Sequence, residues 1–419
     1  MRFRLGGNLW HHSDFIRFWT GDTVTQFTGQ VTSLALPTIA VLTLNVSGFQ
    51  LGLLSALSFI AFPVLGLFVG VWMDRMRRRP VMIAVNLVRL VTLASIPLAF
   101  ITGVLSLYQL YVIALIMGIC TLFFDVAYQS YLPSLVEREN VVEGNQKLQI
   151  SASGAQVVGP SIASLLMGLI GAAMSILVDV MGFFVSVVML FSIRKPEPAP
   201  KADSADGGRH FFGEMKEGIR VITGNSLLWS QAGCTATQNL GTNMYFVALL
   251  LYAYRILGIS KSVIGFAFSL GALGFLLGVL ASTALTKRLG LGRTIALSTA
   301  LNLGLLLVLL PMGNLSLLII GLALFVSNVG IPIYNINQVS LRQIITPDRL
   351  QGRMNATMRT IVWGTIPAGS LIGGILTTLI GIIPTLLAGA IVGGGSILWI
   401  LLGPIIRLRK QPEPVDGES

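Results

Sequence analysis

The sequence contains 419 residues, of which 54% are hydrophobic and only 11% are charged, with a formal net charge of +11. A soluble protein of this length needs more charged residues to cover its surface, so the composition excludes that class and predicts an all-α protein that crosses a lipid bilayer. In such a protein the excess of basic residues reports orientation in the membrane better than it reports nucleic-acid binding.

Twelve apolar runs are long enough to cross the hydrocarbon core, which takes about 20 helical residues. We expect membrane-spanning helices near residues 15–44, 49–73, 80–102, 107–131, 142–170, 173–193, 227–257, 262–286, 293–313, 315–343, 354–381 and 383–406. The first run is too long for the hydrophobic region of a signal peptide, and further spans follow it, so we expect it to be retained.

The basic residues are distributed unevenly between the two sides of this arrangement. About 25 of the 28 Lys and Arg residues lie on the side of both termini, whereas Arg255 and Lys261 lie opposite and Arg89 lies within a span. Loops rich in Lys and Arg stay on the cytoplasmic side of a membrane. We therefore expect a multi-pass protein of the cell inner membrane with both termini in the cytoplasm.

The second span ends in an unusual mixture of one acid and several basic residues, between Gly66 and Arg79. This segment resembles motif A of the major facilitator superfamily, Gly-x-x-x-Asp-Arg-x-Gly-Arg-Arg/Lys, with Arg77 in place of the second glycine. The matching residues are Gly70, Asp74, Arg75, Arg78 and Arg79. We expect a cytoplasmic gate in which Asp74 faces the start of the eleventh span, where the helix dipole and Arg359 favour negative charge.

The longest polar interruption, residues 194–225, divides the chain into six spans and six. We predict an amino-terminal six-helix bundle at 1–193, a cytoplasmic linker at 194–226, a carboxyl-terminal six-helix bundle at 227–406 and a cytoplasmic tail at 407–419. The linker begins with a stiff proline-rich segment and continues into apolar residues at helical spacing, which indicates a helix on the inner leaflet or a partner-binding segment. Weak matches about 212 positions apart, such as Gly21 with Gly233 and Gln26 with Gln238, indicate two related bundles.

Polar residues follow single helical faces in the first, fourth, fifth, seventh and tenth spans. Such stripes are costly against lipid, so they either line a watered cavity or join neighbouring helices by hydrogen bonds. In the major facilitator fold, helices one, four, seven and ten line the central cavity, which favours the first interpretation. The residues that we expect to line this cavity are Gln26, Gln129, Gln149, Gln238, Asn239, Asn243 and Asn335.

Three acids, Asp22, Asp125 and Asp179, lie within predicted spans, where a buried charge indicates function. Asp22 lies on the polar face of the first span, and we expect it to bind the coupling proton, with Asp125 as the further candidate. The alternative for Asp22 is a structural acid that is hydrogen-bonded to its Thr and Gln neighbours. Asp125 and Arg89 lie at similar depth on consecutive helices, which predicts a buried ion pair. Asp179 lies nearer the outer end of the sixth span, and we expect it to be structural.

The fifth span contains the sequence Gly-Pro-Ser-Ile-Ala-Ser, which begins at Gly159. It resembles the Gly-Pro-x-x-Gly-Gly core of motif C, which is associated with antiporters in the same superfamily. Gly159 and Pro160 match the motif, whereas Ala163 and Ser164 replace the glycine pair and keep the side chains small. A proline bends a helix and small residues allow close crossing of two helices, so tight packing is the alternative explanation.

Further matches extend over nearly the whole chain and include Phe124-Asp125-x-Ala127-x-Gln129 and Asp179-x-x-x-Phe183. Together they are similar to the third drug:proton antiporter family, whose members export macrolides, siderophores such as enterobactin and other amphipathic compounds. Such proteins carry a Gly-Asp pair midway along the first helix, where this chain has Gly29 and Gln30. Asp22 must therefore substitute for that acid, or coupling differs.

These features predict a secondary transporter of twelve helices in two pseudo-symmetric bundles, the major facilitator fold, that exports hydrophobic or amphipathic small molecules in exchange for protons. The alternatives are a siderophore exporter, a lysophospholipid translocator and a transport-dead receptor or scaffold. The sequence has no P-loop motif, and its three histidines lie outside the spans without metal-ligand spacing. We therefore expect no enzyme activity, no metal, no nucleic-acid partner and no cofactor beyond the proton gradient, in a monomer surrounded by lipid.

Overall fold

The computed structural model describes residues 8–197, 211–310 and 313–408, and the regular structure within these ranges is helical. The side chains of several residues within helices, Asp74 among them, lie outside the described part of the chain. The helices of the first half are α1 (Ser13–Thr38), α2 (Gly48–Phe59), α3 (Ala61–Asp74), α4 (Arg78–Ile101), α5 (Leu107–Leu135), α6 (Val141–Ile170) and α7 (Ala172–Ser192). Those of the second half are α8 (Phe211–Gly224), α9 (Ser226–Leu251), α10 (Ile264–Leu289), α11 (Leu291–Ala300), α12 (Ser316–Ile344), α13 (Asp348–Leu379), α14 (Ile382–Gly395) and α15 (Ile397–Leu401).

Ten helical segments in the described ranges are long and apolar enough to cross a membrane. Three of these spans are composite: α2 with the start of α3, α11 with the 3-10 helix η5 (Leu301–Leu309), and α14 with α15. The two expected spans outside this set are α1 and α9, each 26 residues long, which carry polar stripes along much of their length. The helical membrane fold is confirmed, and the first and seventh spans stay predictions.

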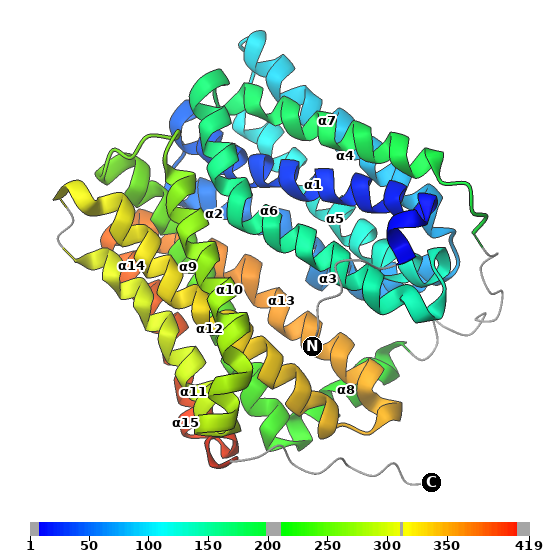
Figure 1. Cartoon of the computed structure of the whole chain (residues 1–419). Coiled ribbons are helices and arrows are strands. Elements are labelled where there is room, and N and C mark those ends of the chain that lie inside the picture. The colour runs from blue at the N-terminus through cyan, green and yellow to red at the C-terminus, as the bar shows by residue number, and fades with distance from the viewer. Residues whose placement is uncertain (1–7, 198–210, 311–312, 409–419) are drawn as a thin grey trace. The chain divides into compact units, whose positions relative to one another are not determined.

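The helices form two compact units, and the first unit consists of Met1–Asn45, Val64–Ala205 and Lys261–Gly265. Within it α1 packs along α6 and α7, and α4 packs along α5 and α7 (Figure 1). α1 and α7 approach closely because Gly21 faces α7: a Cβ atom on Gly21 would lie 3.3 Å from the Cα of Ser186. This close approach brings buried polar groups of the two helices together.

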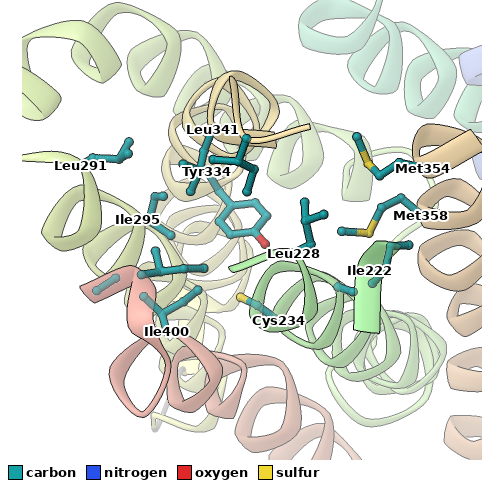
Figure 2. Packing of buried hydrophobic residues seen from close by; sticks show 14 residues of the cluster. Ile222, Leu228, Cys234, Leu291, Ile295, Tyr334, Leu341, Met354, Met358 and Ile400 are labelled. Atoms are coloured by element: carbon teal, nitrogen blue, oxygen red, sulfur yellow. The ribbon is translucent and has the colours of Figure 1, made fainter. Parts of the chain in front are cut away.

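The second unit consists of Val46–Pro63, Asp206–Ser260 and Phe266–Ser419. α9 packs along α13 and α14, α2 packs along α13, and α12 packs against α11 and η5. α8, the helix of the predicted linker, packs against α9 and α13, and its Ile222 is fully buried. Ile222 belongs to an apolar cluster with Leu228, Met354 and Met358 (Figure 2). The linker helix is thus part of the core of the second unit, while its place on the inner leaflet stays a prediction.

Irregular backbone features recur about 210 positions apart, as internal duplication predicts. α1 and α9 each continue into a π-helical turn, η2 (Ile39–Thr43) and η4 (Tyr252–Ile256). Gly171 and Gly381 have φ angles of 85° and 94° where α6 joins α7 and where α13 joins α14. Asn45 and Gly258 likewise have φ angles of 51° and 63° after the two π-helical turns. Gly and Asn are the residues that favour positive φ, so the recurrence of these turns is consistent with the internal duplication.

Candidate functional site

A polar cavity of about 130 Å³ lies within the second unit, among α9, η5 and α12. Nine of its lining side chains are uncharged amides or hydroxyls, and none is charged: Thr235, Gln238, Asn239, Thr242, Asn302, Ser327, Asn328, Tyr334 and Asn335. Phe246, Leu305, Leu324 and Ile331 complete the lining. A site of this composition offers hydrogen bonds to a neutral polar group without a counter-charge for an ion.

Helical spacing explains how α9 and α12 present their polar groups to one cavity. On α9 the lining positions 235, 238, 239 and 242 follow steps of three, one and three, which place them on one face. The helix begins at an Asn225 cap, whose Oδ1 accepts from the N–H groups of Leu227 and Leu228 at 3.0 and 3.4 Å. On α12, positions 327, 328, 331, 334 and 335 repeat the same pattern.

Hydrogen bonds fix part of this lining and leave part of it available. The hydroxyl oxygens of Thr235 and Tyr334 lie 2.7 Å apart, and Figure 2 shows the Tyr334 ring among the buried residues between helices. Ser327 Oγ donates to Asn302 Oδ1 at 2.8 Å. Asn302 is 2% exposed, and its Nδ2 has no hydrogen-bond partner. Asn302 lines the cavity, and its unpaired Nδ2 lies close to α14, because a Cβ atom on Gly393 would lie 2.7 Å from it.

The structure brings three of the four predicted substrate-contacting residues of the second half into this lining: Gln238, Asn239 and Asn335. Asn243 is not part of the lining and donates instead to the backbone carbonyl of Asn239 at 2.8 Å. Asn302 and Ser327 also line the cavity, although neither was among the predicted residues. The signal for Asn302 was the single amide of the ninth span, which is expensive to bury unless it has a hydrogen-bonding role.

Buried charged groups gather in the first unit. Asp22 is 3% exposed, and Tyr128 Oη of α5 donates to its Oδ2 at 3.3 Å, while its Oδ1 has no partner. Arg89 is 6% exposed; its Nη1 donates to Asn86 at 3.4 Å, and the charges of Asp125 and Asp179 act on it. The predicted ion pair between Arg89 and Asp125 stays a prediction.

The other predicted cavity residues of the first unit have more accessible side chains. Gln26 of α1 is half-buried, whereas Gln129 of α5 and Gln149 of α6 are exposed. Gln149 Nε2 lies 3.5 Å from Ser153 Oγ, one turn further along its own helix. Their contact with a substrate stays a prediction.

The predicted gate residues lie where α3 ends and α4 begins. The Asp74 side chain falls outside the described part of the chain, and Gly70 faces open space. Glu197 accepts from the backbone N–H groups of Arg78 and Arg79 at 2.6 and 3.1 Å, and its carboxylate lies 3.8 Å from Arg78 Nη1. The Arg79 guanidinium donates to the carbonyls of Leu190 and Phe191 at the end of α7.

The remaining predicted gate residues, Arg75 and Arg359, have separate surroundings. Arg75 is exposed, and the Arg359 guanidinium lies 4.8 Å from the ring centroid of Trp363, one turn further along α13. The predicted contact of Asp74 with the start of α13 remains a prediction.

Asp14 fastens the same end of α7 to the start of α1. Its carboxylate accepts from the N–H groups of Arg194 and Lys195 at 3.1 and 2.9 Å and from Arg17 Nη1 at 2.7 Å. Burial raises the pKa of the Asp14 carboxyl, but these donors outweigh burial and hold the pKa below its ordinary value. The contacts of Asp14 and Glu197 with Arg78, Arg79, Arg194 and Lys195 are called the linker clasp below.

The motif C-like segment of α6 makes close contacts. Gly159 is buried, and a Cβ atom added to it would lie 2.8 Å from the Cβ of Gln30, the residue that stands in place of the family's aspartate. Ser164 Oγ accepts from the N–H of Gly265 at 2.6 Å, and a Cβ atom on Gly265 would overlap the carbonyl of Pro160. The small residues therefore permit a close crossing, as the packing explanation requires.

Neither a metal cluster nor a disulfide is found in the described ranges. The described residues contain no group of three His, Cys, Asp or Glu side chains that could hold a metal ion. Cys120 and Cys234 are both buried and free. The polar cavity of the second unit and the buried charges of the first unit are therefore the candidate functional features of the described residues.

Comparison with known proteins identifies related sequences. A family model described as Major Facilitator Superfamily matches residues 18–366. Macrolide efflux protein A of Streptococcus pyogenes is 26% identical over 217 residues, 52% of this chain and 53% of that protein. The matched part of the chain thus spans about half the length of these relatives. Enterobactin exporter EntS of Citrobacter koseri is 25% identical over 382 residues, 88% of each chain.

Solved structures with the same fold include two transporters. A bacterial homologue of iron transporter ferroportin in the inward-facing state has a TM-score of 0.74 at 15% identity and covers 94% of this chain and 100% of that chain. Nucleoside transporter NupG has a TM-score of 0.70 at 13% identity, with 93% and 98% of the two chains covered. At these identities the likeness shows the fold alone.

Proposed function

The chain belongs to the Major Facilitator Superfamily, and from this premise we propose that it exports hydrophobic or amphipathic small molecules in exchange for protons. It is a multi-pass membrane transporter whose relatives include proteins named for macrolide efflux and enterobactin export. The observation that carries the proposal is the cavity in the second unit, where uncharged amides and hydroxyls converge inside a membrane-spanning bundle. Polar groups at that depth are tolerated where they line a watered space.

The composition of the cavity supports a neutral polar group on the cargo. Gln238, Asn239 and Asn302 can donate and accept hydrogen bonds, whereas a cation or an anion would find no opposite charge in the lining. A volume of about 130 Å³ holds only a few water molecules, at about 30 Å³ each. The cavity therefore suits one oxygen-rich substituent of an amphipathic molecule, and the apolar remainder would lie elsewhere.

Asp22 is the proposed proton carrier. It is a nearly fully buried acid on a helix of the first unit, with one carboxylate oxygen unpaired and the other held by Tyr128. A charge in this position is costly, so binding of a proton changes the energy of the surrounding structure. Asp125 is the further candidate on α5.

The test is accumulation of a radiolabelled macrolide in everted membrane vesicles that contain the full chain. We expect accumulation to collapse when the proton gradient is dissipated. In vesicles that contain Asp22→Asn, accumulation should fall to the level of vesicles without the protein. Gln238→Leu should weaken accumulation at low macrolide concentration, whereas the matched variant Asn243→Leu, outside the cavity lining, should not. Accumulation indifferent to the gradient would contradict proton coupling, and equal loss in both leucine variants would contradict the role of the cavity.

A siderophore exporter is the second candidate, because the alignment with the enterobactin exporter covers 88% of each chain. Unlabelled enterobactin should then compete with the macrolide in the same vesicles. Competition through the cavity would be weakened by Gln238→Leu, whereas no competition at any concentration would remove this candidate.

We further propose that the motif A residues act as a gate at the cytoplasmic ends of α3 and α4. The linker clasp supports part of this idea, since it holds Arg78 and Arg79 against the end of α7. If Asp74→Asn transports the macrolide at the native rate, the gate proposal fails.

A further inference from the structure

Asp179 is a second buried acid of the first unit, and its surroundings are incomplete. It lies on α7 with 1% of its surface exposed. Thr28 Oγ1 of α1 donates to its Oδ1 at 2.9 Å, whereas its buried Oδ2 has no partner at hydrogen-bond distance, although the Thr32 hydroxyl, which is also unpaired, interacts with the carboxyl group. An ionised carboxylate usually accepts several hydrogen bonds, so an unpaired oxygen in this position is better explained by an acid that carries a proton.

Arg89 of α4 is a buried cation that interacts electrostatically with this carboxyl group. Its guanidinium carbon lies 5.3 Å from the ring centroid of Phe183 and 5.1 Å from that of Phe124. Phe183 follows Asp179 by one helical turn, so ring and carboxyl lie on the same face of α7. The charge of Asp179 acts on Arg89. The guanidinium stacks on the two aromatic rings and forms no salt bridge with Asp179, although the structure describes both residues.

Arg89 is also short of hydrogen-bond partners. It carries five N–H groups, yet its one hydrogen bond is the long contact with Asn86, and its Nε has no partner. Asn86 in turn donates to Ser186 Oγ of α7 at 3.0 Å, which holds α4 against α7. A buried arginine in this condition has donors available for a carboxylate that becomes charged.

We propose that Asp179 is a second proton-binding carboxyl of the transporter and that Arg89 is the cation that responds to its charge. Binding forms one O–H bond on Oδ2 with a proton delivered by water, and Arg89 keeps its own proton throughout. With the proton bound, Arg89 rests on the two phenylalanine rings, as in this structure. When the proton returns to water, the carboxylate accepts N–H donors from Arg89. The use of this proton in transport depends on the proposed export function, whereas proton binding by Asp179 does not.

The other titratable groups around α7 have different partners. On α1, Asp22 lies six residues before Thr28 and is held by Tyr128 of α5. On α6, Glu143 and Lys147 pair with each other at 3.3 Å. On α5, the charge of Asp125 acts on Arg89. Asp22 and Asp179 thus bind their protons in separate surroundings, and substitution of one should leave the other in place.

The test is infrared difference spectroscopy of the full chain in lipid nanodiscs during a pH titration, which reports the carbonyl band of each protonated carboxyl. We expect one band component to be missing in Asp179→Asn and a different component to be missing in Asp22→Asn. A spectrum of Asp179→Asn identical to that of the native protein at every pH would overturn the proposal. The measurement needs no substrate, so it can succeed or fail independently of the vesicle transport test.

Two further variants separate proton binding from a structural role. Asp179→Asn keeps the Oδ1 acceptor for Thr28, so we expect it to fold, and Thr28→Val should weaken packing while keeping the Asp179 band. In Arg89→Gln the band should persist to higher pH than in the native protein, by at least about one pH unit, because a nearby cation favours the ionised acid. A band that disappears at the native pH in Arg89→Gln would overturn the role of the arginine.

Discussion

Asn302 is a buried residue whose amide donor has no partner, and this makes it a sensitive probe of the cavity. A buried unpaired donor costs about 1–3 kcal/mol, and an apolar residue of similar shape removes that cost. We expect Asn302→Leu to leave thermal stability unchanged or to raise it, while macrolide affinity falls about 5–30-fold, as the loss of one or two kcal/mol implies. Thermal unfolding and equilibrium binding of the purified protein measure the two effects.

The control for this experiment is Ser327→Ala, which removes the hydroxyl that bonds Asn302 Oδ1 but keeps the free donor. It should lower stability and change affinity less than Asn302→Leu does. A leucine variant that loses stability and keeps its affinity would show that Asn302 is part of the packing and not of the binding surface.

The sequence pattern indicated side chains of the polar cavity where they repeat along a helix and missed others, while their contact with a substrate stays a prediction. Gln238 and Asn239 belong to a stripe on one face of α9, and Asn335 belongs to a similar stripe on α12, so helical periodicity was enough to find them. Asn302 follows Ser298 and Thr299 at helical spacing, but it is the last polar side chain of this series, because the rest of η5 is apolar. Its place in the cavity depends on how η5 packs against α12, which no local pattern contains.

Asp14 gives a prediction about pH, because its pKa lies below the ordinary value in the folded protein. The unfolded reference is about 3.9, so the ionised clasp contributes its full stability above that pH and loses it as pH falls through the lower folded value. We expect the clasp to be insensitive to pH near neutrality and to open only in acid below about pH 4.

Limited proteolysis at neutral pH tests the clasp directly. In Asp14→Ala the N–H groups of Arg194 and Lys195 lose their acceptors, so trypsin should cut after Arg194 several-fold faster than in the native protein. Arg17→Gln is the control, because it keeps both backbone hydrogen bonds to the carboxylate. Equal cleavage in Asp14→Ala and the native protein would contradict the role of Asp14.

At the scale of elements, the contact between α2 and α13 depends on glycines. A Cβ atom on Gly52 would lie 2.8 Å from the Cα of Gly374 and would overlap the carbonyl of Ser370. Gly52→Ala therefore forces the two backbones apart, and we expect a loss of about 1–3 kcal/mol of stability. The measurement is thermal unfolding in detergent. Gly395→Ala is the matched control, because its added Cβ meets nothing within 4 Å, and an equal effect in both variants would contradict this explanation.

The helices themselves could be predicted well, and their irregularities could not. The expected spans near 107–131 and 142–170 correspond to α5 and α6, since long apolar runs with clear ends need no tertiary information. The break between α2 and α3 and the two π-helical turns come from the way each backbone fits its neighbours. Chain order also could not show that residues 46–63 make their contacts within the second unit.

At the scale of the whole molecule, the most deeply buried charged side chains of the described residues lie in the first unit. The first unit holds Asp22, Arg89 and Asp179, each with an unpaired polar atom, whereas the described cavity of the second unit has an uncharged lining. Buried charges and polar cavity residues both lower the hydrophobicity of the helices that carry them. For this reason α1 and α9 are not among the ten candidate spans. A division of this kind suits a transporter in which the proton and the cargo have separate sites.

The distribution of basic residues predicts the orientation of the protein in the membrane. About 25 of them lie on the side of both termini, which should therefore be cytoplasmic. Thr223 at the end of α8 belongs to that side, and Ser260 before α10 belongs to the other; both are exposed. The native cysteines are buried, so a membrane-impermeant maleimide should give little background. We expect Ser260→Cys to be labelled in intact cells and Thr223→Cys only after permeabilisation. The reverse labelling pattern would show that the protein has the opposite orientation, and the proposed gate would then lie on the other side of the membrane.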